Sequence, residues 1–124
     1  MKKRFLPVAA AGLWITLSEF VRNELLFRQY WVDHFASLGL TFATLPVNGM
    51  LWMIWSVMLA FLIFRLLDRF SFGETLLLSW VAAFAMMWIT VFNLQVLPVG
   101  LLLAAIPLSL LEVTLAALII KRMR

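Results

Sequence analysis

The sequence contains no cysteine, and charge is scarce. Without cysteine, disulfide bonds, thiolate metal sites and cysteine nucleophiles are excluded. Only 13% of the residues are charged, against about 25% in an ordinary soluble domain. The five glycines are scattered singly, so there is no glycine-rich phosphate loop. The single histidine, His34, lacks a second histidine with which to build a metal site. We therefore expect neither a metal nor a cofactor.

Apolar sequence dominates instead. Hydrophobic residues make up 65% of the 124 residues, with a mean hydropathy of +1.05. Charge-free runs longer than about 18 residues are typical of helices that span a lipid bilayer. Most of the ten cationic residues flank these runs, in clusters at 2–4, 65–69 and 121–124. Membrane topology therefore explains the net charge of +4, and we expect no nucleic-acid partner.

We predict an all-α fold, in which residues 1–124 form one transmembrane domain built as a four-helix bundle. The charge-free run 75–111 would be about 55 Å long as one helix, roughly twice the hydrocarbon thickness, so it must turn back near Pro98. The first apolar run continues into Arg22, and we interpret it as a retained helix rather than a signal peptide. The predicted helices cover residues 5–27, 47–67, 74–96 and 98–120.

The cationic clusters also predict the orientation. The side that holds both termini carries eight cations, whereas the other side carries only Arg22 and Arg28. The positive-inside rule then places both termini in the cytoplasm, and we expect a bacterial inner membrane. On the outer side, residues 28–45 carry aromatic side chains of the kind that settle among lipid headgroups. Two forms remain open for this segment, a short interfacial helix and a partly re-entrant loop.

Each predicted helix has one stripe of small or polar residues. Positions i, i+4, i+7 and i+11 lie on one face of a helix. In lipid, small residues let helices approach closely and hydroxyl groups hydrogen-bond across the contact, so we expect these stripes to face inward. The stripes are Gly12, Thr16, Glu19 and Asn23; Gly49, Met53, Ser56 and Ala60; Ser79, Ala83, Met86 and Thr90; and Ala105, Ser109, Glu112 and Ala116.

Two glutamates lie within predicted spans. Glu19 has Arg22 at i+3 and Asn23 at i+4, and we expect it to be ionised and paired with them as a structural anchor. Glu112 has no basic residue within one turn. It is therefore expected either to be protonated and to donate a hydrogen bond, or to pair with a cation from another helix. Glu112 is the first functional candidate, followed by Glu19, Arg22, Asn23 and Ser109; a buried, satisfied glutamic acid is the alternative.

The residues support more than one function. Packing stripes are abundant and no catalytic arrangement is present, so a non-enzymatic role is favoured over an enzymatic one. The leading hypothesis is a structural or accessory subunit that associates with another membrane protein or with itself. The alternative is a proton-linked transporter or channel that uses Glu112 and Glu19. A lipid-modifying enzyme would rest only on the adjacent Asp33 and His34.

In outline the chain is similar to the small multidrug resistance transporters, which have four helices and a glutamate in the first. In that family the carboxylate exchanges protons for cationic drugs. The resemblance implies this role for Glu19, with Trp14 nearby. The chain departs from the family in its strong charge bias and in Arg22, which would compete with a cationic substrate, and no run of residues matches.

Overall fold

The computed structural model describes residues 2–124 and is helical, with no strand in that range. The elements are α1 (Lys2–Phe20), the π-helix η1 (Val21–Leu26), α2 (Arg28–Ser37), α3 (Pro46–Leu66), α4 (Phe72–Trp80), the π-helix η2 (Val81–Ala85), α5 (Met86–Asn93), the 3₁₀-helix η3 (Val99–Leu101) and α6 (Leu102–Met123). Four continuous helical segments are long and apolar enough to cross a membrane: Lys3–Leu26, Pro46–Leu66, Phe72–Asn93 and Val99–Met123. The prediction of an all-helical chain with four apolar helices is confirmed.

Local chemistry fixes where the helices begin and end. Pro46 occupies the first turn of α3, where its missing N–H costs nothing. At the start of α4, the Ser71 hydroxyl accepts a hydrogen bond from the Glu74 amide at 3.2 Å, and the Glu74 carboxylate accepts one from the Ser71 amide at 2.9 Å. The third long helix ends at Asn93 rather than at residue 96, because Gln95 adopts a left-handed backbone with φ 63°.

The first and last long helices extend beyond the predicted limits, to Lys2 and to Met123. The predicted first helix began at residue 5 and the predicted last helix ended at residue 120, so both excluded the terminal charge clusters. Lysine and arginine are good helix formers, so the helical backbone continues through these clusters.

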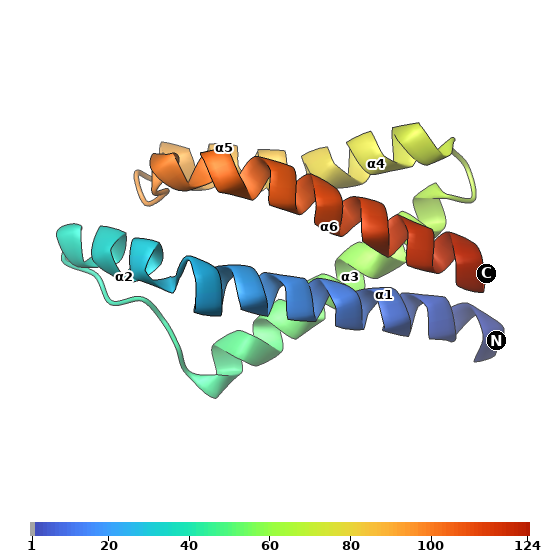
Figure 1. Cartoon of the computed structure of the whole chain (residues 1–124), viewed down its shortest axis with the longest axis horizontal. Helices are drawn as coiled ribbons and strands as arrows, with labels where there is room; N and C mark the ends of the chain where they lie inside the picture. The colour runs from blue at the N-terminus through green and yellow to red at the C-terminus, as the bar shows by residue number, and fades with distance from the viewer. Residues whose placement is uncertain (1) are drawn as a thin grey trace.

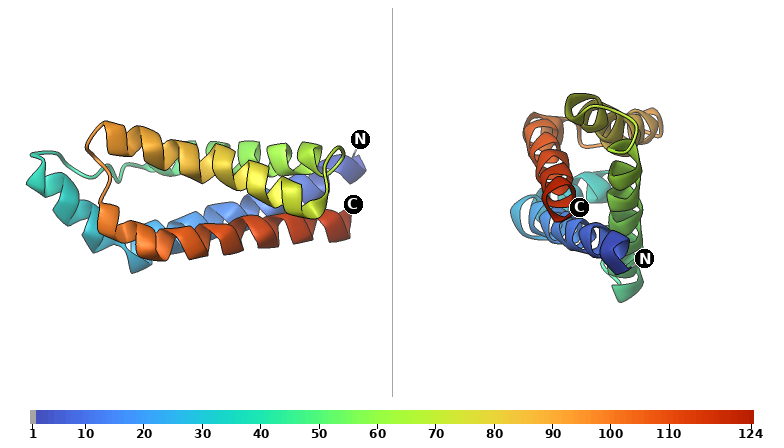
Figure 2. Two further views of the ribbon diagram at one scale, coloured as in Figure 1. Left: turned by 90° about the horizontal axis from the view of Figure 1, so that it is seen from above. Right: turned by 90° about the vertical axis from the view of Figure 1, so that its right-hand side faces the viewer.

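The long helices form a ring. Helix α1 packs against α3 and α6, and α4 packs against the same two helices, which gives the ring order α1, α3, α4, α6 seen end-on in Figure 2. The first turn of α1, the last turn of α6 and the α3–α4 turn lie at one end, here called the cationic end (Figure 1). Helix α2 and the α5–α6 turn lie at the opposite end, here called the aromatic end.

The core is formed by residues of α1, α3, α6 and η2. Gly12 allows the close approach of α1 to α3, because a methyl group there would lie 3.2 Å from Val57 Cγ2 and 3.4 Å from Val57 Cα. At the cationic end, Arg124 forms an ion pair with Asp68. The buried apolar residues are Val8, Ala11, Ile15, Leu59, Ala60, Ile63, Phe64, Ala83, Phe84, Val113, Ala116, Ala117 and Ile120.

The small and polar stripes are buried over most of their length. The buried members are Gly12, Glu19, Ser56, Ala60, Ser79, Ala83, Ala105, Ser109, Glu112 and Ala116, while Thr16 and Asn23 are partly buried. The inward orientation is wrong for Gly49, Met53, Met86 and Thr90, which are exposed. All four lie toward the aromatic end.

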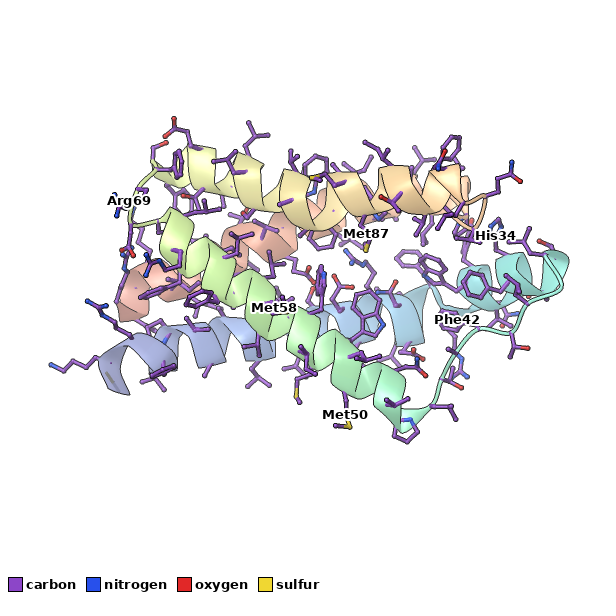
Figure 3. All side chains as sticks on the ribbon, turned by 180° about the vertical axis from the view of Figure 1, so that it is seen from behind. His34, Phe42, Met50, Met58, Arg69 and Met87 are labelled. Carbon is purple, nitrogen blue, oxygen red and sulfur yellow. The ribbon has the colours of Figure 1, made fainter. Side chains whose placement is uncertain are left out.

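Two physical reasons explain these four exceptions. Helix α3 is inclined to the other long helices, so its first turns, marked by Met50, diverge from α5, marked by Met87 (Figure 3). In the third long helix, the π segment η2 adds a residue to one turn and shifts the inner face by one position. Met87 and Val91 therefore take the partly buried places expected for Met86 and Thr90.

Candidate functional site

A buried ion pair lies at the junction of α1 and η1. Glu19 is 3% exposed and Arg22 is 7% exposed. The Arg22 Nη2 atom donates to Glu19 Oε1 at 2.5 Å, and the Asn23 amide donates to Glu19 Oε2 at 2.9 Å. The pairing expected from the i+3 and i+4 spacing is therefore present, and both carboxylate oxygens of Glu19 are bonded.

The arginine comes from one π-helix and packs on another. Arg22 belongs to η1, where the Phe27 amide donates to the Arg22 carbonyl at 2.9 Å, the i+5 bond of a π-helix. Its guanidinium carbon lies 5.4 Å from the centre of the Phe84 ring, in η2. This distance allows a cation–π interaction. Two of the irregular helical turns therefore meet at the ion pair, and such turns are frequent at functional sites.

Glu112 reaches the same region from α6. Glu112 is only 1% exposed. Neither of its carboxyl oxygens has a hydrogen-bond partner among residues 2–124. Glu19, Ser18 and Arg22 are the polar side chains around it. Arg22 and Glu112 line one cavity of about 260 Å³, and Arg22 Nη1 has no hydrogen-bond partner in the described chain. The structure thus groups Glu19, Arg22 and Glu112 into one buried set, here called the carboxyl–guanidinium cluster.

Hydrogen bonds from two tryptophans hold α6 in place beside the cluster. The Trp14 indole N–H donates to the backbone carbonyl of Glu112 at 2.9 Å, which ties α1 to α6. The Trp80 indole N–H donates to the Ser109 hydroxyl at 2.9 Å, which ties α4 to α6. Ser109 also donates to the Ile106 carbonyl at 2.9 Å, so its hydroxyl is fully engaged in packing.

A cavity of about 260 Å³ adjoins the ion pair at the aromatic end and is here called the aromatic cavity. It lies where α3 diverges from α5 (Figure 3). Its polar lining comes from Glu19, Arg22, Asn23, Glu24 and Asn48. Its aromatic lining comes from Trp31, Phe35, Phe42, Trp52 and Trp88. A neighbouring cavity of about 280 Å³ shares Glu19, Asn23, Glu24, Asn48 and Trp52 with it.

Helix α2 supplies part of the aromatic wall. The Trp31 indole N–H donates to the Asn23 side-chain oxygen at 3.0 Å. The Trp31 ring stacks on Phe42, with centroids 6.0 Å apart and planes at 14°, and Phe35 packs edge-on against Trp31. Residues 28–37 form a helix, and three aromatic residues of the segment 28–45, Trp31, Phe35 and Phe42, line the cavity.

Asp33 and His34 lie apart from this cavity. Asp33 accepts a hydrogen bond from the Gln29 amide at 2.6 Å, and no hydrogen bond or ion pair joins it to His34 in the described residues. Both face a separate pocket beside Pro98 and Gly100. Within residues 2–124, no group of three or more His, Cys, Asp or Glu side chains could hold a metal ion.

The charges that line the aromatic cavity do not balance. Glu19 neutralises Arg22, whereas Glu24 lines both cavities and belongs to neither of the two ion pairs found between residues 2 and 124. The site therefore carries one unpaired carboxylate. Sequence analysis did not select Glu24, Trp31 or Trp88 as site residues. The available signal was the dense polar run Glu19 to Glu24 at the end of an apolar segment.

Comparisons with protein-family models, with curated proteins and with solved structures found no match. The proposals below therefore rest on the chemistry of the site alone.

Proposed function

We propose that this is an integral membrane protein that binds a small organic cation in the aromatic cavity and exchanges it for a proton on the carboxyl–guanidinium cluster. The observation that carries the proposal is the burial of three ionisable side chains, Glu19, Arg22 and Glu112, at 3%, 7% and 1% exposure. Burying ionised groups costs several kcal/mol each, and apolar residues of similar size often stabilise a fold better. Intramembrane ionisable groups mark ion and proton pathways.

The four apolar helices support a location in a lipid bilayer. The cationic clusters lie at one end of the bundle (Figure 1), which supports a cytoplasmic position for that end under the positive-inside rule. A bacterial inner membrane fits this arrangement. On this orientation the aromatic cavity lies in the outer half of the bundle.

Charge balance links the cation to the proton. The cluster contains two carboxyl groups and one guanidinium group, so one bound proton makes it neutral. An organic cation in the aromatic cavity, beside Glu19 and Glu24, adds a second positive charge to the site. Opposite charge nearby favours an ionised carboxyl group. The cation and the proton therefore compete for the same carboxyl groups, which couples their binding.

The lining favours an organic cation over an anion. Tryptophan rings attract ammonium groups through their faces, and Trp31, Trp52 and Trp88 line the cavity. Glu24 supplies the unpaired negative charge. The volume of about 260 Å³ restricts the site to small molecules.

The proposal is tested by measuring proton release from the purified protein in weakly buffered detergent solution with a pH indicator. Benzyltrimethylammonium, an aromatic cation, should release protons from the wild-type protein, and benzenesulfonate, an aromatic anion, should not. Glu112→Gln should abolish the release because the cluster then needs no proton to be neutral. Glu74→Gln is the matched control, since Glu74 is exposed at the cationic end and glutamine preserves a capping box.

Two results would contradict the proposal. One is the absence of proton release from the wild-type protein. The other is release from Glu112→Gln that equals the wild type while size-exclusion chromatography shows equal folded yield. A positive result would be extended to proteoliposomes, where an imposed pH gradient should drive benzyltrimethylammonium uptake by the wild type and not by Glu112→Gln.

A structural or accessory role, in association with another membrane protein or with a second copy, is the second candidate. Exposed methionines on α3, at positions 50, 53 and 58, favour it, because methionine adapts to many apolar surfaces. Native mass spectrometry of protein extracted from its own membrane separates the candidates. A stoichiometric partner would favour the accessory role, and a chain without partner that releases protons on cation binding would favour exchange.

A further inference from the structure

We infer that the groove between α1 and α3 at the cationic end binds an anionic phospholipid. The groove encloses about 550 Å³. Its apolar lining includes Phe5, Val57, Met58 and Phe61, and Arg4 and Arg65 are its cationic members. This site is separate from the aromatic cavity and rests only on the membrane location proposed above.

The packing of α1 on α3 creates the groove. The two helices approach closely where they cross at Gly12 and Val57, since a methyl group on Gly12 would lie 3.2 Å from Val57 Cγ2. Beyond that crossing they diverge toward the cationic end (Figure 1), and Val57 forms the inner limit of the groove. Phe5 and Met58 are 69% and 66% exposed, so the groove is open along its side. A lipid chain could therefore enter from the bilayer.

The polar end of the groove matches a phosphate group. Arg4 lies in the first turn of α1 and Arg65 in the last turn of α3, so both guanidinium groups belong to the helix ends where lipid headgroups would lie. Neither guanidinium group forms an ion pair within the described residues. Asp68, the carboxylate three residues from Arg65, pairs with Arg124 instead. Guanidinium groups bind phosphate oxygens in a bidentate manner.

The combination of an apolar lining and two arginines then selects the occupant. A free phosphate ion would satisfy the arginines and leave the apolar part open, whereas a neutral lipid would fill the apolar part and leave two cations unbalanced. A second copy of this chain would bring the same two arginines to the interface, which like-charge repulsion opposes. An anionic phospholipid satisfies both parts, and a juxtamembrane cluster of cations is typical of such recognition.

The test is the thermal unfolding of the purified protein in a neutral detergent with three separate additions. Phosphatidylglycerol should raise the melting temperature, and phosphatidylcholine and inorganic phosphate should not. In the double variant Arg4→Gln, Arg65→Gln the apparent affinity for phosphatidylglycerol should fall about tenfold or more, because charge-assisted hydrogen bonds are lost. The control is the double variant Arg28→Gln, Arg122→Gln, which has the same net charge as the first double variant. It should bind phosphatidylglycerol like the wild type.

Several outcomes would overturn the lipid site. One is a rise in melting temperature with phosphatidylcholine, or with inorganic phosphate alone, that equals the rise with phosphatidylglycerol. Another is an equal loss of affinity for phosphatidylglycerol in both double variants. A dimer that blocks lipid binding would also overturn it, and analytical ultracentrifugation detects that case. Alkaline carbonate extraction of cell membranes tests the membrane location independently, so failure of the lipid site and failure of the proposed location are distinguishable.

Discussion

The substitution Gly12→Ala tests the contact between α1 and α3 most directly. The added methyl group would lie 3.2 Å from Val57 Cγ2, closer than such carbons normally approach, and 3.4 Å from Val57 Cα, at the edge of ordinary van der Waals contact. Val57 cannot relieve this by rotating, because valine has one strongly preferred χ1 rotamer in a helix. Its Cα atom moves only with the backbone. The methyl group therefore has to push the two helices apart.

Two opposing effects determine how much Gly12→Ala changes the free energy of unfolding. Overpacking in a well-packed contact costs about 1–3 kcal/mol. Replacing glycine by alanine in a helix stabilises by about 0.5–1 kcal/mol. The substitution Gly49→Ala isolates the second effect, since a methyl group at Gly49 meets nothing within 4 Å. The helix-propensity effect is common to both variants, so Gly12→Ala should be less stable than Gly49→Ala by about 1–3 kcal/mol.

Reversible unfolding in mixed detergent micelles, followed by tryptophan fluorescence, measures this difference. Adding Val57→Ala to Gly12→Ala removes the Cγ2 atom and should recover part of the loss, which a double-mutant cycle quantifies. Equal stability of the two glycine variants would show that α1 and α3 do not cross at Gly12. Absence of coupling to Val57 would show that another neighbour limits the space.

Two further predictions concern single hydrogen bonds. Ser71→Ala removes the cap of α4 and should lower the free energy of unfolding by about 1 kcal/mol, whereas Ser37→Ala, at the end of α2, should change it by less than about 0.5 kcal/mol. A comparable loss in both serine variants would argue against the cap. Trp80→Phe and Ser109→Ala each break the bond between α4 and α6 and should each cost about 1 kcal/mol. Because both substitutions remove the same bond, the double variant should lose clearly less free energy of unfolding than the sum of the two single losses. Strictly additive losses would exclude that bond.

The apolar helices could be read from the sequence because their causes are local. Hydrophobic runs of bilayer length, Pro46 at a helix start and charge clusters at helix ends all act within a few residues. The pairing of Glu19 with Arg22 and Asn23 is local as well, since i+3 and i+4 neighbours share one helix face. The four-residue stripe also located the inner face of α6 without error, because α6 contains no π segment.

The aromatic cavity could not be read from the sequence, because it depends on contacts between distant segments. The approach of Glu112 to Glu19 joins residues 93 positions apart, and the packing of Arg22 on Phe84 joins two different helices. The inclination of α3 separates its first turns from α5, which leaves a cavity of about 260 Å³.

The two π segments explain how aromatic side chains come to face that cavity. One extra residue in a helical turn rotates everything that follows by about 100°, so the inner face moves to the next residue along. In the first long helix, η1 and the non-helical residue Phe27 that follows it (φ −120°, ψ 16°) break the regular repeat. Leu26 and Tyr30, which a regular helix would turn inward, are exposed, and Trp31 lines the cavity instead. Beyond η2, the same shift exposes Met86 and brings Met87 to the lining.

A π segment therefore interrupts the regular repeat in two of the long helices, and the two segments meet where Arg22 of η1 lies on Phe84 of η2. In both helices the stripe residues before the π segment are buried or partly buried. Residues that follow it, Trp31 in one case and Met87, Trp88 and Val91 in the other, line the cavity. The π turn is rare in proteins, and packing alone does not require one. The two π segments meet where Arg22 lies on Phe84, so the aromatic cavity adjoins the carboxyl–guanidinium cluster, as the proposed exchange of a cation for a proton requires.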